Sequence, residues 1–458
     1  MTTTVVILAA GLGTRMRSKR AKVLHQAGGM ALVEHVVGAA RAVAPPENIV
    51  VVTGHQAEEV ESVLAASRVR FARQTEQKGT GHALACARES APISDLVMVL
   101  YGDTPLLSQG TLLHLRNTQA NSRAAATLIT TSLDDPTGYG RVILDENRLV
   151  SSIVEERSCT AEQRSIRLIN SGIYCFRADL LWTHLREIQP NALSQEYYLT
   201  DMASILRGHG HRVQAMNVGN ANELLGINTR LELADADRLL RRRKADELML
   251  CGVTIEQPET VSIDSRVQVG MDTVIEPSTR LLGDTEIGED CVIGAGSIIV
   301  SSVLASGSIV RPYSLISDSR VETGAQIGPF SRLRMNARIG KGARVGNFVE
   351  VKKSRIGAGT KSQHLAYLGD AEIGENVNVG AGTITCNFDG KEKHETHIGS
   401  GAFIGSNSTL VAPVVIGTES YVGAGSVVTD PVPDQALALG RGRQVVKTDW
   451  VAKRNKKS

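Results

Sequence analysis

A cluster of glycines and basic residues near the N-terminus has the composition of a phosphate-binding site. Gly11 and Gly13 are followed by Thr14 and Arg15, and Lys22 comes shortly after. Glycines at a strand-to-helix junction let backbone N–H groups approach phosphate oxygens, while Arg and Lys neutralise the phosphate charge. The spacing fits neither a Walker motif nor a Rossmann fingerprint, so it predicts a phosphate site of another kind.

Asp103 is a candidate metal ligand in the same half of the chain. It follows the apolar run 97–100, and open α/β sheets bind their ligands at the carboxyl ends of strands. Mg²⁺ keeps several waters and phosphate oxygens, so one or two protein oxygens suffice to hold it. The simpler alternative is an aspartate that only caps a helix or a turn.

The C-terminal half contains a second set of residues suited to catalysis. Arg334 and Lys352 supply positive charge for a sugar phosphate, and His364 follows in a segment that also contains Tyr367. Histidine has an unperturbed pKa of about 6.5 and accepts a proton at neutral pH. With Asn378 nearby in the repeat, this set predicts a general base beside an anion site, whereas His364 alone would be read as a surface histidine.

The elements that position the first set alternate between strands and helices, which predicts βαβ units and a mostly parallel sheet. Residues 229–250 contain no Gly or Pro and predict one long helix. Its basic cluster, 241–244, is interpreted as a solvated helix face. The expected strands are Val5–Ala9, Ile49–Thr53 and Leu96–Leu100, and the expected helices are Val33–Val43, Ala57–Ala66 and Thr111–Arg116.

The elements that position the second set follow a six-residue repeat. Of the 44 glycines, 17 lie in residues 1–251 and 27 in residues 252–458, and aromatic residues make up only 3% of the chain. A six-residue unit suits one face of a triangular parallel β-helix, with the aliphatic residue inside and a small residue at the corner. The aliphatic positions are Val269, Ile275, Leu281, Ile287, Ile293 and Ile299; Ile309, Leu315, Val321, Ile327, Leu333, Ile339, Val345 and Val351; and Ile398, Ile404, Leu410, Ile416, Val422 and Val428.

Two segments depart from this repeat. Residues 361–370 interrupt the six-residue spacing, and residues 386–396 delay it until Ile398. Loops that leave a regular scaffold often close over a ligand. The repeat resembles the left-handed β-helix of hexapeptide-repeat proteins over residues 252–430, and we expect ligand chemistry at its two breaks.

The first half resembles the sugar-nucleotide pyrophosphorylases. The stretch Leu8–Met16 followed by Lys22 matches their signature, and Ala21 stands where the family has proline. Further matches are Gln74 with Gly79–His82, Tyr101–Leu106 and Gly138–Arg141. The resemblance implies a Rossmann-like nucleotidyltransferase in which Arg15 and Lys22 are catalytic, Asp103 and Asn228 bind Mg²⁺, and the nucleotide and sugar are bound by Leu8, Ala9, Ala10, Gly11, Lys22, Gln74, Gly79, Thr80, Tyr101, Gly102, Asp103, Gly140, Glu155, Asn170 and Asn228.

Over residues 4–445 the chain resembles the bacterial family of bifunctional enzymes that acetylate glucosamine 1-phosphate with acetyl-coenzyme A and then join N-acetylglucosamine 1-phosphate to UMP from UTP. The products are UDP-N-acetylglucosamine and pyrophosphate, for peptidoglycan and lipopolysaccharide precursors. The resemblance implies a homotrimer formed through the β-helix, in which His364 is the general base. Arg334, Lys352, Tyr367 and Asn378 would bind the sugar phosphate, and Ala381, Asn387, Phe388, Lys393, Ser406, Ala424 and Arg441 would bind acetyl-coenzyme A. Phe388 stands where the family has tyrosine, so only packing by that ring is expected.

Composition limits the other functions. The 458 residues carry 50 Lys and Arg against 48 Asp and Glu, so no global field argues for nucleic acid. No apolar run approaches the roughly 20 residues of a membrane span. The six cysteines form no C-x-x-C pair, which is typical of reduced thiols in a cytoplasmic protein.

We expect domains at 1–228 and 251–458, a linker helix at 229–250 and a basic tail at 453–458.

Two alternative functions remain open from the sequence. One is a single-activity pyrophosphorylase whose β-helix only regulates or trimerises, and the other is a non-catalytic assembly module that combines similar domains. The set around His364 argues against the first, and Arg15, Lys22 and Asp103 argue against the second.

Overall fold

The computed structural model describes residues 1–192 and 194–455, which divide into two compact units, Met1–Leu240 and Arg241–Ser458. The division falls inside the long helix α8 (Arg230–Leu250), whose Ala236 and Leu240 pack in the first unit while Ala245 and Leu248 pack in the second. The expected boundaries at residues 228 and 250 stay a prediction. The tail residues 456–458 lie outside the described part, and a short helix, α9 (Trp450–Asn455), precedes them.

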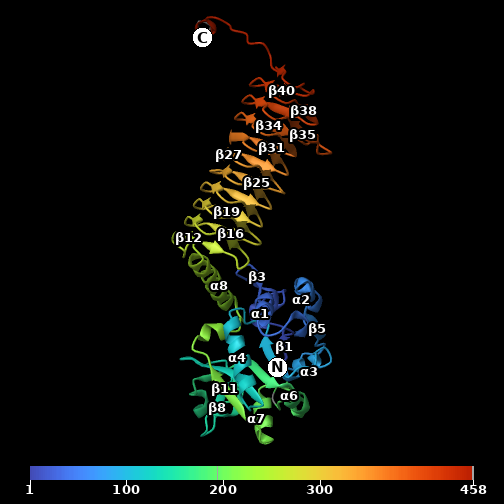
Figure 1. The fold of residues 1–458 in the computed structure, drawn as a ribbon, viewed down its shortest axis with the longest axis vertical. Helices are drawn as coiled ribbons and strands as arrows, with labels where there is room; N and C mark the ends of the chain where they lie inside the picture. The colour runs from blue at the N-terminus through green and yellow to red at the C-terminus, as the bar shows by residue number, and fades with distance from the viewer. Residues whose placement is uncertain (193, 456–458) are drawn as a thin grey trace. The chain divides into compact units, whose positions relative to one another are not determined.

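The first unit is built on a nine-stranded sheet in which seven strands have the order β11-β7-β10-β6-β1-β4-β5 and β8 and β9 form an antiparallel extension (Figure 1). The strands are β1 (Thr3–Leu8), β4 (Ile49–Thr53), β5 (Arg70–Arg73), β6 (Leu96–Tyr101), β7 (Ala126–Ser132), β8 (Arg141–Leu144), β9 (Val150–Val154), β10 (Leu168–Arg177) and β11 (Val213–Asn217). The helices are α1 (Leu32–Ala40), α2 (Ala57–Val63), α3 (Thr80–Ala87), α4 (Gln109–Asn121), α5 (Ala161–Arg164), α6 (Ala178–His184) and α7 (Asp201–Gly208).

Both faces of this sheet are covered, which explains why its strands are continuous apolar runs. Val5 and Ile7 of β1 pack in one cluster with residues of α1, α2 and α4. Val6 and Leu8 pack in the other cluster with residues of α3, α6 and α7. Because β1 and β6 pair in parallel up to Leu8 and Tyr101, their carboxyl ends meet at one edge of this three-layer unit.

The sheet is mixed, and the expectation of a mostly parallel sheet is confirmed for the seven-strand order, in which only β10 runs against the other strands. Strand β1 pairs in parallel with β4 and β6, but β10 runs antiparallel to both β6 and β7. Periodicity shows that a run is a buried strand but does not show its direction, because the same side chains are buried in either case.

The second unit is a left-handed parallel β-helix made of three sheets, with 11, 10 and 9 strands, that share one core (Figure 1). The sheets run from β12 (Thr254–Ile255) to β41 (Leu437–Ala438), from β13 (Ser262–Ile263) to β40 (Val427–Val428) and from β14 (Gln268–Val269) to β38 (Val414–Ile416). Among the described residues, the buried core of this unit contains aliphatic side chains, alanines and Cys291 and no aromatic ring. This explains the low aromatic content.

The six-residue pattern identifies most of the inward positions, but two of them were assigned wrongly. Ile309 is half-buried and Leu315 is 36% exposed, whereas their neighbours Val310 and Ile316 are fully buried. Because Val321 is also buried, the step from Ile316 to it covers five residues instead of six. Where two aliphatic residues are adjacent, a fixed spacing cannot show which one points inward.

The two breaks in the repeat differ structurally. Residues 361–370 do not leave the coil, because they form β30 (Lys361–His364) and β31 (Tyr367–Gly369), and Ser362 is buried at the inward position. The change there is one of composition and not of backbone path. Residues between β34 (Ile384–Cys386) and β35 (Thr396–Ile398) do leave the coil as a short hairpin.

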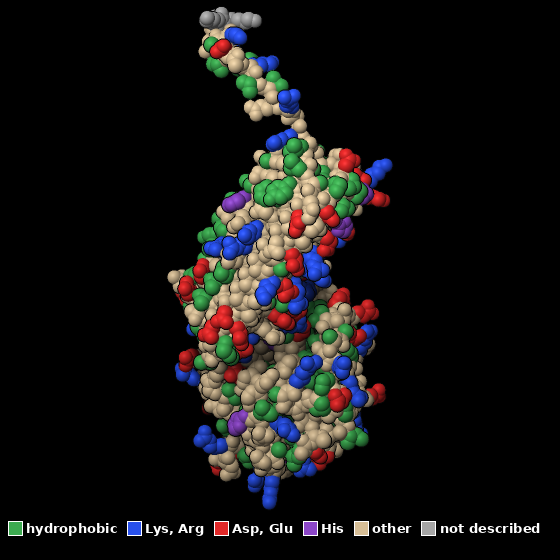
Figure 2. All heavy atoms as spheres, turned by 45° about the horizontal axis from the view of Figure 1, so that its top comes forward, with side chains coloured by type: hydrophobic (Ala, Val, Ile, Leu, Met, Phe, Trp, Pro, Cys, Tyr) green, Lys and Arg blue, Asp and Glu red, His purple; other side chains and the backbone are tan. Residues whose placement is uncertain are grey.

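The surface carries both charge signs, as the composition predicts. On the face shown in Figure 2, basic and acidic side chains are interspersed. In the basic cluster of α8, Arg241 pairs with Asp264, Arg242 with Asp246 and Lys244 with Glu247. All six cysteines are free thiols. Within the described ranges, no helix is long and apolar enough to cross a bilayer.

Candidate functional site

The predicted catalytic residues of the first unit meet at the carboxyl edge of β1 and β6. The Lys22 ammonium forms an ion pair with the Asp103 carboxylate and donates to Asn228 Oδ1 at 3.1 Å. Arg15 donates to the same Asn228 oxygen at 2.9 Å. Four residues that lie as much as 213 positions apart in the sequence are therefore hydrogen-bonded in one network.

Glycine makes the close approach in this loop possible. Gly13 has φ +62°, and a Cβ there would lie 2.6 Å from the Lys22 Cβ. A side chain at this position would therefore strain the backbone and displace Lys22. The Gly102 N–H donates to the Leu8 carbonyl at 2.9 Å, which joins the two strand ends that carry the glycine-rich loop and Asp103.

Asn228 is held in place by the start of α8. The Glu232 carboxylate accepts from the backbone N–H of Asn228 at 2.6 Å and of Thr229 at 2.8 Å, as a helix-capping acid does. The Ile227 N–H donates to the Asp103 carbonyl at 2.9 Å. The helix that follows the sheet therefore fixes the second predicted metal ligand beside the first.

Asp103 and Asn228 have a donor set and a placement that fit Mg²⁺. One carboxylate oxygen and one amide oxygen both contact the Lys22 ammonium, so the two oxygens already converge on a single cationic group. Two protein oxygens are enough for this ion when a substrate supplies phosphate oxygens.

The predicted nucleotide contacts line the start of α3. Gln74 Nε2 donates to the Gly79 carbonyl at 3.1 Å and lies 3.0 Å from His82 Nδ1. The Thr80 hydroxyl accepts from the Leu199 N–H at 3.0 Å. Gly79 has φ +97°, and a Cβ there would lie 2.7 Å from the Tyr197 carbonyl oxygen, so only glycine fits.

The predicted sugar contacts are also brought together. The Asn170 N–H donates to the Gly140 carbonyl at 2.9 Å, and a Cβ on Gly140 would lie 3.7 Å from Glu155 Oε2. Burial raises the pKa of Glu155, whose Oε1 accepts from the Thr200 hydroxyl at 3.1 Å.

Tyr101 lies beside the predicted sugar contacts, next to Gly172. Burial also raises the pKa of Tyr101, and its ring covers Gly172, where a Cβ would be 2.4 Å from the ring. The Gly172 N–H donates to Asn170 Oδ1 at 3.1 Å. A neutral phenol and a half-buried carboxyl therefore border the predicted sugar position.

The predicted phosphate ligands of the second unit are adjacent in one sheet. Arg334 ends β25 (Arg332–Arg334), Lys352 ends β28 (Glu350–Lys352), and the two residues pair directly across the ladder. Neighbouring strands lie about 4.8 Å apart. Arg334 donates to the Glu350 carboxylate at 2.6 Å. Two cations are thus presented side by side.

Asp370 is a residue that sequence reasoning missed. Its buried carboxylate accepts from Lys352 at 3.1 Å, lies 3.2 Å from Lys353 Nζ and accepts from the Asn387 side-chain amide. These hydrogen bonds outweigh burial and lower the pKa of Asp370. It joins the predicted phosphate ligand to the predicted coenzyme A ligand. The only sequence signal was a charged residue at the end of the segment 361–370.

His364 and Tyr367 lie on either side of one corner of the coil. His364 ends β30 and Tyr367 begins β31, in neighbouring sheets, with Leu365 at the turn (φ +46°). The Tyr367 hydroxyl reaches over Gly369, which pairs with Lys352, since a Cβ on Gly369 would be 2.4 Å from it. The exposed His364 imidazole has no hydrogen-bond partner within the described ranges, so its nitrogens are accessible.

Asn378 is in the same sheet as His364, one coil further along. It begins β33 (Asn378–Val379), which pairs with β30 in the register Lys361↔Asn378. It is half-buried, and its backbone N–H donates to Ala402.

Four predicted coenzyme A contacts form one column along successive coils. The carbonyl of Ala381 accepts from the Asn407 N–H at 2.7 Å, and that of Ser406 accepts from the Gly425 N–H at 2.8 Å. Arg441 donates to the Ala424 carbonyl at 2.8 Å. The register of β30 with β33 places Ala381 one coil above His364, so the column continues from the predicted base.

The hairpin that leaves the coil holds the remaining predicted contacts. Asn387 is buried against Asp370, whereas Phe388 is 59% exposed and bridges Lys393 across the hairpin. The neighbouring Lys352 ammonium lowers the pKa of Lys393. Lys393 therefore adds a further positive charge beside the predicted phosphate ligand Lys352.

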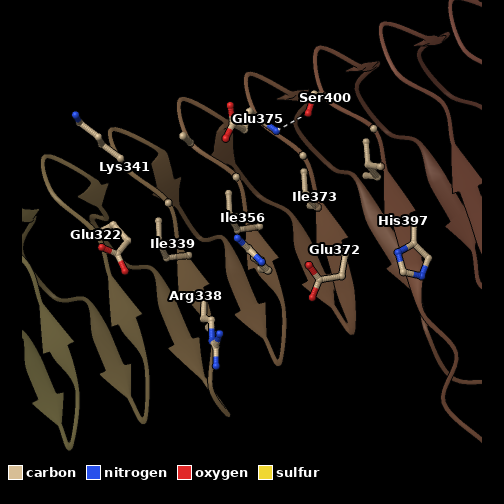
Figure 3. Close-up of a pocket in the computed structure, with 18 of the residues that line it drawn as sticks. Glu322, Arg338, Ile339, Lys341, Ile356, Glu372, Ile373, Glu375, His397 and Ser400 are labelled. Atoms are coloured by element: carbon tan, nitrogen blue, oxygen red, sulfur yellow. Dashed lines mark hydrogen bonds between the residues drawn. The ribbon is translucent and has the colours of Figure 1, made fainter.

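A groove of about 1260 Å³ lies on a different face of the β-helix and contains none of the predicted site residues. Figure 3 shows two rows of the residues that line this groove, with Lys341, Glu375 and Ser400 in the upper row and Arg338, Glu372 and His397 in the lower row. A Cβ on Gly374 would lie 2.6 Å from the Ser400 nitrogen, and one on Gly357 would meet the Gly374 backbone, so these glycines let successive coils stack closely. We assign no role in catalysis to the groove.

Comparisons with known proteins give two domain families. Residues 5–166 match the MobA-like NTP transferase domain. Residues 266–301 and 395–430 match the bacterial transferase hexapeptide, in six repeats. The two matches fall in the two units separately.

Relatives match over nearly the whole length of the chain. The chain is 53% identical to the bifunctional protein GlmU of Solibacter usitatus, covering 99% of this chain and 97% of the relative. It is 48% identical to that of Koribacter versatilis (98% and 97%) and 44% identical to that of Alkaliphilus metalliredigens (98% and 98%).

Proposed function

This chain belongs to the family of bifunctional GlmU proteins, and from this membership and the two sites we infer that it carries two transferase activities. It is a nucleotidyltransferase and an acetyltransferase. It acetylates glucosamine 1-phosphate and then transfers UMP to N-acetylglucosamine 1-phosphate, giving UDP-N-acetylglucosamine. The observation that carries this conclusion is the near-complete match to bifunctional relatives, and a single-activity pyrophosphorylase is not favoured for the same reason.

The uridylyl transfer takes place at the carboxyl edge of the first unit. A phosphate oxygen of N-acetylglucosamine 1-phosphate attacks the α-phosphorus of UTP, the bond from that phosphorus to the bridging oxygen breaks, and pyrophosphate leaves. The nucleophile is already largely ionised at pH 7, because its second pKa is about 6, so no general base is required. Arg15 and Lys22 neutralise the repulsion between the two polyanions.

The other residues of this unit position the two substrates. The backbone of Leu8 to Gly11, Gln74, Gly79 with Thr80, and Tyr101 to Gly102 holds the nucleotide, while Gly140, Glu155 and Asn170 hold the sugar. Asp103 and Asn228 would hold Mg²⁺, and the convergence of their oxygens on Lys22 supports this role. When bound, the ion supplies positive charge to the triphosphate.

The acetyl transfer takes place at the corner beside His364. The amine of glucosamine 1-phosphate attacks the thioester carbonyl of acetyl-coenzyme A, His364 accepts the proton that the amine loses, and the carbon–sulfur bond breaks. Coenzyme A leaves as the thiolate and takes up a proton. Arg334 and Lys352 bind the phosphate, and Tyr367 and Asn378 position the sugar.

Acetyl-coenzyme A lies along the column above His364. Ala381, Ser406, Ala424 and Arg441 follow one another on successive coils, and Asn387, Phe388 and Lys393 border the lower end of the column. A column of this kind can accommodate a long cofactor better than a compact pocket could.

The second unit assembles as a homotrimer that completes the acetyl site. Tyr313, Phe330 and Phe348 stack with ring centroids 5.4 Å apart and are 60%, 48% and 60% exposed. Association would cover an apolar ladder of this kind.

The enzyme works in the cytoplasm on small molecules, without nucleic acid or membrane partners, and free thiols in all six cysteines support that compartment. Its product enters the peptidoglycan and lipopolysaccharide precursors that maintain cell shape.

Two separate assays test this proposal on the purified chain. With acetyl-coenzyme A and glucosamine 1-phosphate, a colorimetric thiol reagent should detect coenzyme A release. With UTP, N-acetylglucosamine 1-phosphate and Mg²⁺, pyrophosphate release should be measured. Production of pyrophosphate without any thiol release would leave only the single-activity enzyme, and a failure of both reactions would overturn the proposal.

A further inference from the structure

A cluster of two histidines and one glutamate lies in the first unit and takes no part in the proposed reactions. His184 ends α6, Glu187 ends the short 3₁₀ helix η6 (Leu185–Glu187), and His209 follows α7. His184 Nδ1 is 2.7 Å from Glu187 Oε1, and His209 Nε2 is 2.9 Å from Glu187 Oε2. The candidate ligand atoms of all three residues lie within 4.8 Å of one another.

The directions of these groups suit a shared cation. Both imidazoles aim a ring nitrogen at the same carboxylate, so their lone pairs converge when those nitrogens are deprotonated. Two ligands at about 2.0–2.1 Å from a tetrahedral Zn²⁺ are roughly 3.3 Å apart. The observed nitrogen–oxygen separations of 2.7 and 2.9 Å therefore need to open by only about half an ångström.

The backbone holds the second histidine in position. The Gly210 N–H donates to the Arg207 carbonyl, the His211 N–H donates to the Leu206 carbonyl, and Gly210 has φ +78°. This is a Schellman ending, which needs glycine at the left-handed residue. It fixes His209 at the end of α7 and brings His211 close, with its ring centroid 5.9 Å from that of His184.

The local charges favour a cation. Both His184 and His209 lie at the C-terminal ends of helices, where the backbone carries partial negative charge. The nearest basic side chain on α7, Arg207, is paired with Asp145 at 2.7 Å. The His184 side chain is 11% exposed, but Glu187 and His209 are 41% and 47% exposed, so an ion reaches the cluster from solvent.

We propose that His184, Glu187 and His209 form a binding site for a divalent transition metal, with Zn²⁺ as the best match and water in the fourth position. Two imidazoles and one carboxylate are a common Zn²⁺ set, and they are too rich in nitrogen for Mg²⁺. The site differs from the one at Asp103 and Asn228 in its ligands and in its metal.

The metal would act as a structural clip. Residues between Glu187 and His209 include Tyr197 and Leu199, whose backbone groups contact Gly81 and Thr80 at the start of α3. Thr200, in the same segment, donates to Glu155. An ion at the cluster ties the two ends of this segment together and stabilises the wall of the proposed nucleotide and sugar sites.

Metal binding is measured on the full chain after chelation and desalting, under reducing conditions. The Asp103→Asn variant serves as the starting protein, because it removes the oxygen site at the sheet edge. We expect titration with ZnCl₂ to show one site that is lost in Glu187→Gln and in His209→Asn. Saturating Zn²⁺ should raise the melting temperature of the starting protein by about 5 °C and should not change that of the two variants.

Two controls keep the test decisive. His397→Asn removes a histidine that lies outside the cluster and forms an ion pair with Glu395 at 3.6 Å, so it should not change the zinc stoichiometry. Co²⁺ should give the strong visible absorption of tetrahedral coordination, and that absorption should be absent in His209→Asn. Equal zinc stoichiometry and equal melting shifts in the starting protein, Glu187→Gln and His209→Asn would overturn the proposal. If Glu187→Gln fails to fold, the half-exposed His209→Asn alone decides.

Discussion

The two candidate sites are assembled in opposite ways. In the first unit, Lys22 contacts residues 81 and 206 positions away, and these contacts exist only because the strand and helix ends meet at one sheet edge. In the second unit, Arg334 and Lys352 are 18 positions apart and become neighbours because one coil separates them. Sequence distance therefore predicts spatial contact in the β-helix and carries no such information in the α/β unit.

This difference also separates the two kinds of chemistry. The first unit gathers charge at one point, as a reaction between two polyanions requires. The second unit distributes its predicted coenzyme A contacts along a column of successive coils. Because the two units have separate cores, we expect variants in one site not to change the reaction of the other.

The largest expected effect is on acetyl transfer. His364→Ala should lower kcat for coenzyme A release by about 10²–10⁴-fold, because it removes the base that accepts the proton of the amine. Uridylyl transfer, measured as pyrophosphate release, should not change. His394→Ala, in the nearby hairpin, is the matched control and should retain acetyl transfer. An equal loss of both activities in His364→Ala would show that the two sites are not independent.

The reciprocal change tests the first unit. Asp103→Asn should lower uridylyl transfer by about 10²–10³-fold, because a carboxylate that holds charge at the triphosphate is lost. Acetyl transfer should not change, and chelation with EDTA should have the same selective effect as the substitution. Asp135→Asn, a turn residue that accepts from the Thr137 N–H, is the control. Loss of acetyl transfer on chelation would contradict the comparison.

The register of the β-helix is tested by two neighbouring substitutions. Ile316→Ala should lower the free energy of unfolding of the second unit by about 2–5 kcal/mol, because Ile316 is fully buried. Leu315→Ala, at the residue that a strict six-residue spacing places inside, should cost less than about 1 kcal/mol, since Leu315 is partly exposed. Chemical denaturation of the two variants measures both values. A larger loss of unfolding free energy in Leu315→Ala than in Ile316→Ala would show that the strict six-residue spacing gives the inward residue correctly.

The smallest expected effect comes from Asp370. Asp370→Asn should raise KM for glucosamine 1-phosphate by roughly tenfold, with a smaller change in kcat, because the buried Lys352 ammonium loses its paired charge. Lys353→Ala, which removes the exposed partner of the same carboxylate, should change KM much less. An unchanged KM in Asp370→Asn would show that Lys352 does not depend on this pair.

The lowered pKa of Asp370 makes the stability difference between the wild type and Asp370→Asn depend on pH. Because its hydrogen bonds lower the pKa in the folded state, its stabilising contribution is present above the ordinary aspartate pKa of about 3.9 and is lost as the pH falls through the lower folded value. The difference in unfolding free energy between wild type and Asp370→Asn should therefore shrink on acidification.

The sequence indicated the composition of both sites but not all of their contacts. The glycine-rich loop, Asp103 and Asn228 were named from motifs, and the structure joins them in one network. Glu232, which caps Asn228, and Asp370, which pairs Lys352, were not identified, because a capping or bridging carboxylate has no fixed spacing from its partner. The proposed zinc ligands were not identified for the same reason, since His184 ends α6 and His209 follows α7.

By itself the sequence determined the two-part architecture, the repeat of the second unit and the residue types that each reaction needs. Periodicity carries this information because burial repeats with the geometry of the coil or the strand. Only the tertiary structure decided the direction of β10, the five-residue step before Val321 and the meeting of Lys22 with Asp103 and Asn228. These features depend on which elements pack together, and packing is chosen by the free energy of the whole core and not by any single segment.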